Sequence, residues 1–197
     1  MRRLRFLTLA LLTYCVVGIF ALSSPMLHAA VPHGWRLAGS YPQEYEVGTR
    51  VEKAGPPNSI AYLRSTTENT HGFGTVMQSI SAEHYAGHRV RLSADVKSDH
   101  LTAWAGLWLR ADKDMKSVAF DNMQNRAIRG TQDWQHYEVI LDIPEDATSV
   151  HFGALLAGAG EIDVTRFKLD LLPDPRIPQI GPPPMMQSRP VNLDLKP

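Results

Sequence analysis

Two tryptophans, a glycine and an arginine alternate with small and aliphatic residues in the segment 104–110. On an extended strand, Trp104, Gly106, Trp108 and Arg110 share one face, and the alanine and two leucines between them share the other. Aromatic rings stack on the apolar C–H face of a sugar, and a guanidinium donates hydrogen bonds to sugar hydroxyls. If the aliphatic face points into a core, the segment presents a ligand-binding face with an indole on either side of a glycine.

A polar segment follows closely in the chain, where Asn122 and Gln124 alternate with Asp121 and Met123 after Phe120. Amides and carboxylates exchange hydrogen bonds with hydroxyls. We therefore predict that Asn122 and Gln124 join the ligand face, and that Asp121 joins it if a bulge or twist turns it there. The alternative is that both tryptophans lie in the core and the amides in a buried network, because tryptophan is usually well buried.

Catalytic signatures are absent from the sequence: there is no G-x-S-x-G, H-E-x-x-H, P-loop or G-x-G-x-x-G motif. The histidines after residue 30 stand at 33, 71, 84, 88, 100, 136 and 151, without the short spacing of a metal site. Acid pairs such as Asp112/Asp114 and Glu145/Asp146 fall in predicted turns, where aspartate commonly bonds the backbone. A glycosidase pair of carboxylates far apart in the chain stays open as an alternative. We predict a non-enzymatic protein without catalytic residues, metal ligands or cofactors.

The elements that must position these residues are β-strands. Arg89–Lys97 alternates strictly, with its apolar residues Val90, Leu92, Ala94 and Val96 on one face. Other strands are predicted at Ser59–Arg64, Gly74–Ile80, Ala103–Arg110, Val118–Asn122, Gln135–Ile143, Val150–Leu156 and Glu161–Leu172. Turn residues recur between them and no window has a sustained helical period. Residues 34–172 are therefore predicted to form an all-β, antiparallel two-sheet β-sandwich of the jelly-roll type.

The last predicted strand changes parity. Ile162 and Val164 share one face, whereas Phe167, Leu169 and Leu171 share the other. A single β-bulge near Thr165–Arg166 would return all five to the core. The alternative is that both faces of this strand are covered.

Both ends of the chain differ from the central domain. Residues 1–30 contain three arginines and then an uncharged run, Phe6–Leu22, which is typical of a signal peptide cut after Ala29 or Ala30. An uncleaved N-terminal membrane anchor is the alternative. Either would place the domain outside the cytoplasmic membrane, periplasmic or secreted. Residues 173–197 hold eight prolines, which favours a disordered Pro-rich tail.

The charge balance limits the classes of partner. The whole chain has 20 Lys and Arg against 20 Asp and Glu, so residues 31–197 carry a formal charge of −3 once the three N-terminal arginines are set aside. This balance lacks the basic footprint of a nucleic-acid-binding domain, and we predict no nucleic-acid partner and no membrane contact beyond residues 1–30. The single cysteine excludes a disulfide framework.

Several long blocks form a distinctive succession along the central domain. They are GWRLAGS (34–40), YEVG (45–48), GFGTVMQSI (72–80), YAGHRVRLSADVKS (85–98), WAGLWLRAD (104–112), AFDNMQNRAIRGTQDWQHYEVILDIP (119–144) and FGALLAGAGEIDV (152–164). This succession resembles a family of bacterial galactose-binding-like β-sandwich modules, found alone behind a signal peptide or appended to transcriptional regulators. It is more distantly similar to jelly-roll carbohydrate-binding modules.

The resemblance implies a fold more directly than a function. Arg50 stands where the family often has an aspartate, which speaks against an ion site near that strand. Our main functional hypothesis is an exported, non-catalytic module that binds a carbohydrate or another small polyhydroxylated ligand. The alternative is a structural or protein-interaction domain with a partner protein in the cell envelope.

Overall fold

The structure is a computed structural model that describes residues 31–51, 59–172 and 189–196. The predicted signal peptide at residues 1–30 and most of the predicted tail lie outside these ranges. Within them the chain forms strands and two short 3-10 helices: β1 (Arg36–Gly39), η1 (Pro42–Glu44), β2 (Tyr45–Val51), β3 (Ser59–Ser65), β4 (Phe73–Ser81), β5 (Arg89–Lys113), β6 (Lys116–Asp121), η2 (Gln124–Arg126), β7 (Ile128–Asp142), β8 (Ser149–Ala157) and β9 (Glu161–Leu171). None of the described helices is long and apolar enough to cross a membrane.

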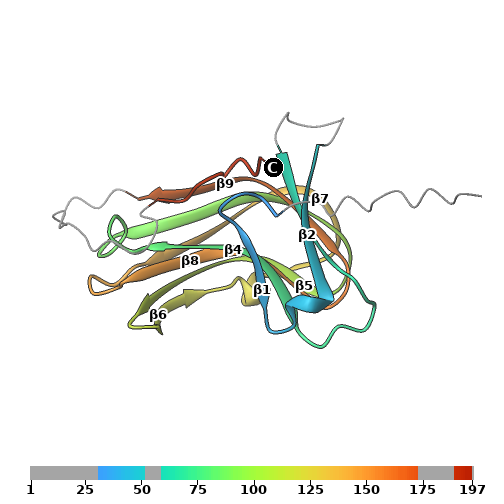
Figure 1. The fold of residues 1–197 in the computed structure, drawn as a ribbon, viewed down its shortest axis with the longest axis horizontal. Coiled ribbons are helices and arrows are strands. Elements are labelled where there is room, and N and C mark those ends of the chain that lie inside the picture. The colour runs from blue at the N-terminus through green and yellow to red at the C-terminus, as the bar shows by residue number, and fades with distance from the viewer. Residues whose placement is uncertain (1–30, 52–58, 173–188, 197) are drawn as a thin grey trace, which may run out of the picture.

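The strands form two layers that share the long strand β5, and all their pairings are antiparallel. One layer has the order β1-β4-β8-β5-β6 and uses the second half of β5. The other has the order β2-β3-β9-β5-β7 and uses mainly the first half. Figure 1 shows β8 and β6 in the lower part of the sandwich and β9 in the upper part. The predicted two-sheet sandwich is confirmed.

Strand β5 differs from the prediction, which placed separate strands at Arg89–Lys97 and Ala103–Arg110. The two are one continuous strand that passes from one layer to the other. The chain changes direction at His100, whose φ is +49°, and the register with β7 shifts on both sides of this residue. The left-handed residue bends the strand without ending its pairing, so no turn is needed.

The bulge predicted in the last strand is confirmed. Arg166 has a φ of +55°, and two steps along β5, from Ser93 to Asp95, oppose three along β9, from Lys168 to Thr165. Apolar residues on both sides of the bulge, including Phe167, thereby reach the core. Leu171 is the exception: it is exposed, because it is the last residue of β9.

The core lies between the two layers. Its largest fully buried side chains come from both, and they include Leu63, Ile80, Leu92, Leu107, Leu109, Phe152, Leu156 and Ile162. Trp35 closes one end of this core, where its ring contacts Phe152 and Phe167 at centroid distances of 5.8 and 4.6 Å. The alternating residues of β5 face this core as their pattern predicted.

Residues 189–196 differ from the expected tail because they pack against the sandwich. Leu195 is fully buried within the main core. The side chain of Gln78 donates to the Val191 carbonyl (2.5 Å) and accepts from the Val191 N–H (3.2 Å), and the Trp35 indole N–H donates to the Asn192 carbonyl (3.0 Å). These contacts satisfy two buried polar side chains that would otherwise face the core. Figure 1 draws this segment in dark red.

Candidate functional site

A cleft of about 630 Å³ lies on the outer face of the layer β1-β4-β8-β5-β6. The inner face of the same layer supplies the core, so each strand alternates between core and cleft. In β5, Ala105, Leu107 and Leu109 are fully buried in the core, and Trp104, Trp108 and Arg110 on the opposite face line the cleft. The cleft is lined by Arg36, Ala38, Gly39, Gly72, Phe73, Thr75, Met77, Trp104, Trp108, Arg110, Phe120, Asn122, Leu155 and Ala157.

Trp108 forms the floor of the cleft. Its indole N–H donates to the Thr75 hydroxyl (2.7 Å), and that hydroxyl donates to the Ala154 carbonyl (2.8 Å). Because Thr75 is on β4 and Trp108 is on β5, the indole extends across the intervening strand β8. Trp108 packs with Met77 and Leu155 in a small apolar cluster that is separate from the main core.

The structure brings together four of the six predicted site residues: Trp104, Trp108, Arg110 and Asn122 all line this cleft. The position of Trp108 combines features of the two interpretations. It faces the ligand side, as predicted for binding, yet only 7% of its surface is exposed, as expected of a core residue. Trp104 is half-buried at the side of the cluster.

The space expected at Gly106 between the two indoles is closed. A Cβ at this position would lie 3.1 Å from the Asn122 carbonyl oxygen and 3.1 Å from the Met123 Cβ. The chain therefore crosses directly over Gly106 after β6. Met123, whose φ is +61°, then reaches the core, where it is almost fully buried.

Asp121 and Gln124 do not line the cleft, which corrects the predicted site. Asp121 pairs with Arg126 (2.8 Å) and accepts a hydrogen bond from the Met123 N–H (2.8 Å). Gln124 begins η2 and is exposed. Both border a neighbouring, more open depression of about 440 Å³. Phe120 and Asn122 border this depression as well as the cleft. The alternation of β6 predicted Gln124 on the face of Asn122, and the left-handed turn at Met123 ends that alternation. Asp121, which the alternation puts on the other face, lines the depression and not the cleft.

A polar cluster lies beside the cleft and holds its two arginines. Arg36 donates to the Ser79 hydroxyl (2.9 Å), and Ser79 contacts Nδ1 of His151 (2.8 Å). Nε2 of His151 lies 3.2 Å from the Asp112 carboxylate, which pairs with the Arg110 guanidinium (2.8 Å). Ser79, Asp112 and His151 do not line the cleft themselves. They therefore position Arg36 and Arg110 from beside the cleft.

Burial lowers the pKa of His151, and the positive charges of Arg110 and Arg36 lower it further. The carboxylate of Asp112 acts in the opposite direction without reversing the shift. The imidazole is therefore neutral at pH 7. In that state one ring nitrogen donates and the other accepts, which suits a bridge between a hydroxyl and a carboxylate.

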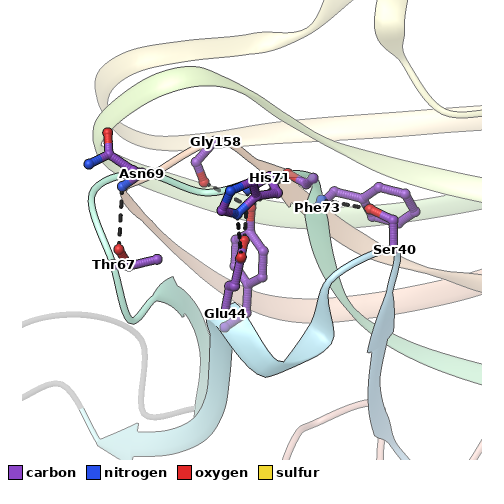
Figure 2. Close-up of polar contacts among 9 residues, drawn as sticks. Ser40, Glu44, Thr67, Asn69, His71, Phe73 and Gly158 are labelled. Carbon is purple, nitrogen blue, oxygen red and sulfur yellow. Dashed lines mark hydrogen bonds and ion pairs between the residues drawn. The ribbon is translucent and has the colours of Figure 1, made fainter.

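Gly72 of the loop before β4 and Phe73, the first residue of that strand, line one end of the cleft. Figure 2 shows this loop, with Glu44 beside His71 and Ser40 beside Phe73. The Glu44 carboxylate accepts from the His71 N–H (2.7 Å) and contacts the His71 ring (2.6 Å). The Tyr45 hydroxyl donates to the Gly72 carbonyl (2.8 Å). A backbone hydrogen bond from His71 holds the pKa of Glu44 below its usual range. These contacts fix the loop, so this end of the cleft is preformed.

Sequence reasoning missed the parts of the cleft contributed by β1, β4 and β8. The alternation of Thr75 and Met77 with core residues along a predicted strand could have indicated that both lie on the outer face. No sequence pattern could have placed Arg36 there, because β1 spans four residues and is too short for a periodic pattern. In the part of the chain that the structure describes, no group of three or more His, Cys, Asp or Glu side chains could hold a metal ion.

Comparisons with known proteins place the fold. No family model matches the chain. A curated relative, described as an uncharacterized HTH-type transcriptional regulator YbfP of Bacillus subtilis, is 40% identical over 131 residues. The match covers 66% of this chain and 44% of the regulator, so the chain spans less than half of that relative's length.

Among solved structures, the chain is similar to the CBM22-1 xylan-binding domain of Paenibacillus barcinonensis Xyn10C, with a TM-score of 0.52 and 16% identity over 73% of this chain and 89% of that one. It is also similar to a cyclase from Fischerella sp. TAU, with a TM-score of 0.53 and 15% identity over 74% of this chain and 88% of that one. One fold thus serves a binding domain and an enzyme. The protein has the jelly-roll β-sandwich fold of carbohydrate-binding modules, as the resemblance implied.

Proposed function

We propose that this protein is a non-catalytic module that binds a carbohydrate or a similar polyhydroxylated ligand in the cleft. One observation carries the proposal: Trp104, Trp108, Arg110 and Asn122 line the same cleft on the outer face of one layer. Indoles bind the apolar face of a sugar, and the guanidinium and amide bind its hydroxyls. The composition of the cleft, mainly apolar with a few polar groups at its sides, is typical of small-ligand sites.

The proposal includes export. The N-terminal residues 1–30 have the pattern of a signal peptide or an uncleaved anchor, which would bring the domain to polysaccharides outside the cytoplasmic membrane. Detection of the domain in the periplasmic or secreted fraction, with or without residues 1–30 by mass spectrometry, tests this part. Recovery of the whole chain in the cytosol would contradict it.

The proposal also includes the absence of catalysis. Ser79, His151 and Asp112 are in consecutive contact, as the serine, histidine and aspartate of a hydrolytic triad are. Three contacts favour a positioning role for them. The Ser79 hydroxyl accepts from Arg36, the Asp112 carboxylate pairs with Arg110, and Nε2 of His151 also contacts Ser149 (3.0 Å). We expect no turnover of chromogenic acetyl esters. Hydrolysis that disappears in Ser79→Ala would contradict this part of the proposal.

The binding test is calorimetric titration of residues 31–197 with xylohexaose, a probe chosen because a xylan-binding domain shares the fold. We expect Trp104→Ala to weaken binding at least about tenfold, as loss of a central aromatic contact commonly does. Tyr62→Ala is the matched control, because Tyr62 lies on β3 in the opposite layer, between Arg50 and Arg64. Equal loss in both variants, or unchanged binding by Trp104→Ala, would refute the assignment of the cleft.

A second candidate function is protein interaction, favoured by exposed apolar side chains on β6. Val118 and Phe120 are 42% and 53% exposed, and Met115 before this strand is 95% exposed. An exposed edge strand can pair with a second chain. Sedimentation would then show concentration-dependent dimers that Val118→Lys abolishes. A monomer at all concentrations would exclude self-association through β6.

A further inference from the structure

The charges around the cleft are not balanced. Two guanidinium groups, those of Arg36 and Arg110, line it, and none of its lining residues is acidic. Arg110 is neutralised by Asp112, with 2.8 Å between its Nε and a carboxylate oxygen. Arg36 donates only to the neutral hydroxyl of Ser79, and it forms no ion pair within the described ranges. The cleft therefore keeps one uncompensated positive charge.

The location of Arg36 relates this charge to the floor of the cleft. In the strand register, Arg36 lies opposite Met77, Met77 opposite Gly153, and Gly153 opposite Trp108. These four residues form one row across the layer. At about 4.8 Å between neighbouring strands, the row places the Cα atoms of Arg36 and Trp108 about 14 Å apart. A short oligosaccharide lying over Trp108 along this row would therefore reach the Arg36 guanidinium.

The charge of Arg36 also acts on the polar cluster beside the cleft. Burial lowers the pKa of His151 most, the Asp112 carboxylate raises it, and the charges of Arg110 and Arg36 both lower it. A guanidinium presents its N–H groups as a planar fork that matches a carboxylate. The Ser79 contact holds this fork in place while leaving its charge unneutralised.

We propose that the cleft selects an acidic saccharide, and that Arg36 binds the carboxylate of a uronic acid unit while Trp108 and Trp104 contact its neighbours. This inference rests on the proposed function and narrows it to a class of ligand. It also assigns the selectivity to a residue of β1, a strand that contributes nothing to the predicted aromatic face.

The test compares two probes that differ in one group: xylotetraose, and xylotetraose carrying a single glucuronic acid branch. We expect residues 31–197 to bind the acidic probe at least about tenfold more tightly at low salt, because charge-assisted hydrogen bonds are the stronger ones. Arg36→Gln should bring the two affinities to within about twofold of each other by weakening only the acidic complex. Arg36→Lys should retain part of the preference, since it keeps the charge and loses the fork.

The control is Arg64→Gln, which removes an exposed arginine from β3 in the opposite layer. It should leave both affinities unchanged. Equal binding of the two probes by the wild type, or a preference that survives Arg36→Gln, overturns the acidic-ligand inference and leaves the proposed function standing. Binding of neither probe overturns both.

Discussion

The outer faces of the two layers use arginine in different ways. On the layer β2-β3-β9-β5-β7, arginines pair with carboxylates of other strands. Arg50 of β2 pairs with Asp163 and Glu161 (2.7 Å) of β9, across β3, and Arg89 of β5 pairs with Asp142 (2.6 Å) of the neighbouring β7. On the cleft face, Arg36 donates to the Ser79 hydroxyl and pairs with no carboxylate among the described residues. Arginines that are paired with carboxylates hold strands together. An arginine without a carboxylate partner, in a cleft lined by aromatic side chains, is available to bind a ligand.

The difference between the faces extends to aromatic residues. Tyr62 on the paired face lies between the guanidinium groups of Arg50 and Arg64, at 5.5 and 5.4 Å from its ring centroid. Trp108 on the cleft face is held by a single hydrogen bond at its edge and packs among apolar side chains. The same strand geometry therefore supports a surface occupied by its own charges and a surface with room for another molecule.

Replacing the floor of the cleft should have the largest effect. Trp108→Ala removes a side chain that is 7% exposed, and we expect it to destabilise the fold by about 3–5 kcal/mol as well as abolish xylohexaose binding. Urea unfolding followed by circular dichroism measures the first effect and calorimetry the second. A loss of binding without a loss of stability would mean that the indole is a surface group, which is one of the two interpretations that the sequence left open.

Trp108→Phe separates the two roles of this residue. It keeps most of the ring and removes the hydrogen bond to Thr75. We expect about 1–3 kcal/mol of destabilisation, because the buried Thr75 hydroxyl loses its donor.

The cleft layer also depends on the C-terminal segment, through Gln78 of β4. We expect Leu195→Ala to cost about 2–5 kcal/mol, since Leu195 is fully buried in the main core. Leu171→Ala, at an exposed leucine of the opposite layer, is the control and should cost under about 0.5 kcal/mol. Equal, small effects in chemical denaturation would show that residues 189–196 behave as the free tail that their composition suggests.

Removing one charge from each face tests the comparison directly. Asp163→Asn breaks the pair with Arg50 at a side chain that is only 6% exposed, and it should cost about 1–3 kcal/mol without changing ligand binding. Arg36→Gln should change stability by less than about 0.5 kcal/mol and alter only ligand selectivity. If thermal melts show a large loss of stability for Arg36→Gln and a small one for Asp163→Asn, Arg36 has the structural role instead.

The smallest expected effect is on how the free energy of unfolding depends on pH. Because the pKa of His151 is lowered in the folded protein, the unfolded chain takes up a proton first as the pH falls below about 6.5. The contribution of His151 to stability is therefore complete above that pH and is lost as the pH falls toward the folded-state pKa. The groups that face it are Arg36, Ser79, Arg110, Asp112 and Ser149.

His151→Asn should flatten the slope of unfolding free energy against pH below about pH 6.5. Parallel slopes in the wild type and His151→Asn would show that His151 does not titrate differently on folding.

The sequence determined the sandwich, the core faces and the bulge, because these follow from local alternation. Val90, Leu92 and Ala94 are fully buried as their period of two predicts, and the parity change in β9 is resolved by the bulge at Arg166. The same alternation separated the core face of residues 104–110 from the face that lines the cleft. A regular strand encodes the side on which each residue lies, and the sequence alone reveals this.

Only the tertiary structure decided which residues meet across strands and where the chain leaves regular geometry. Gln124 left the site because the left-handed turn at Met123 redirects the backbone after β6, whereas Asp121 stays on the face that the alternation of β6 gives it. Arg36 entered the site because β1 pairs with β4, which places it opposite Met77, 41 positions later in the chain. Leu195 reached the core from a proline-rich segment because Gln78 and Trp35 bind its backbone neighbours. Such contacts depend on partners distant in sequence, and no local period encodes them.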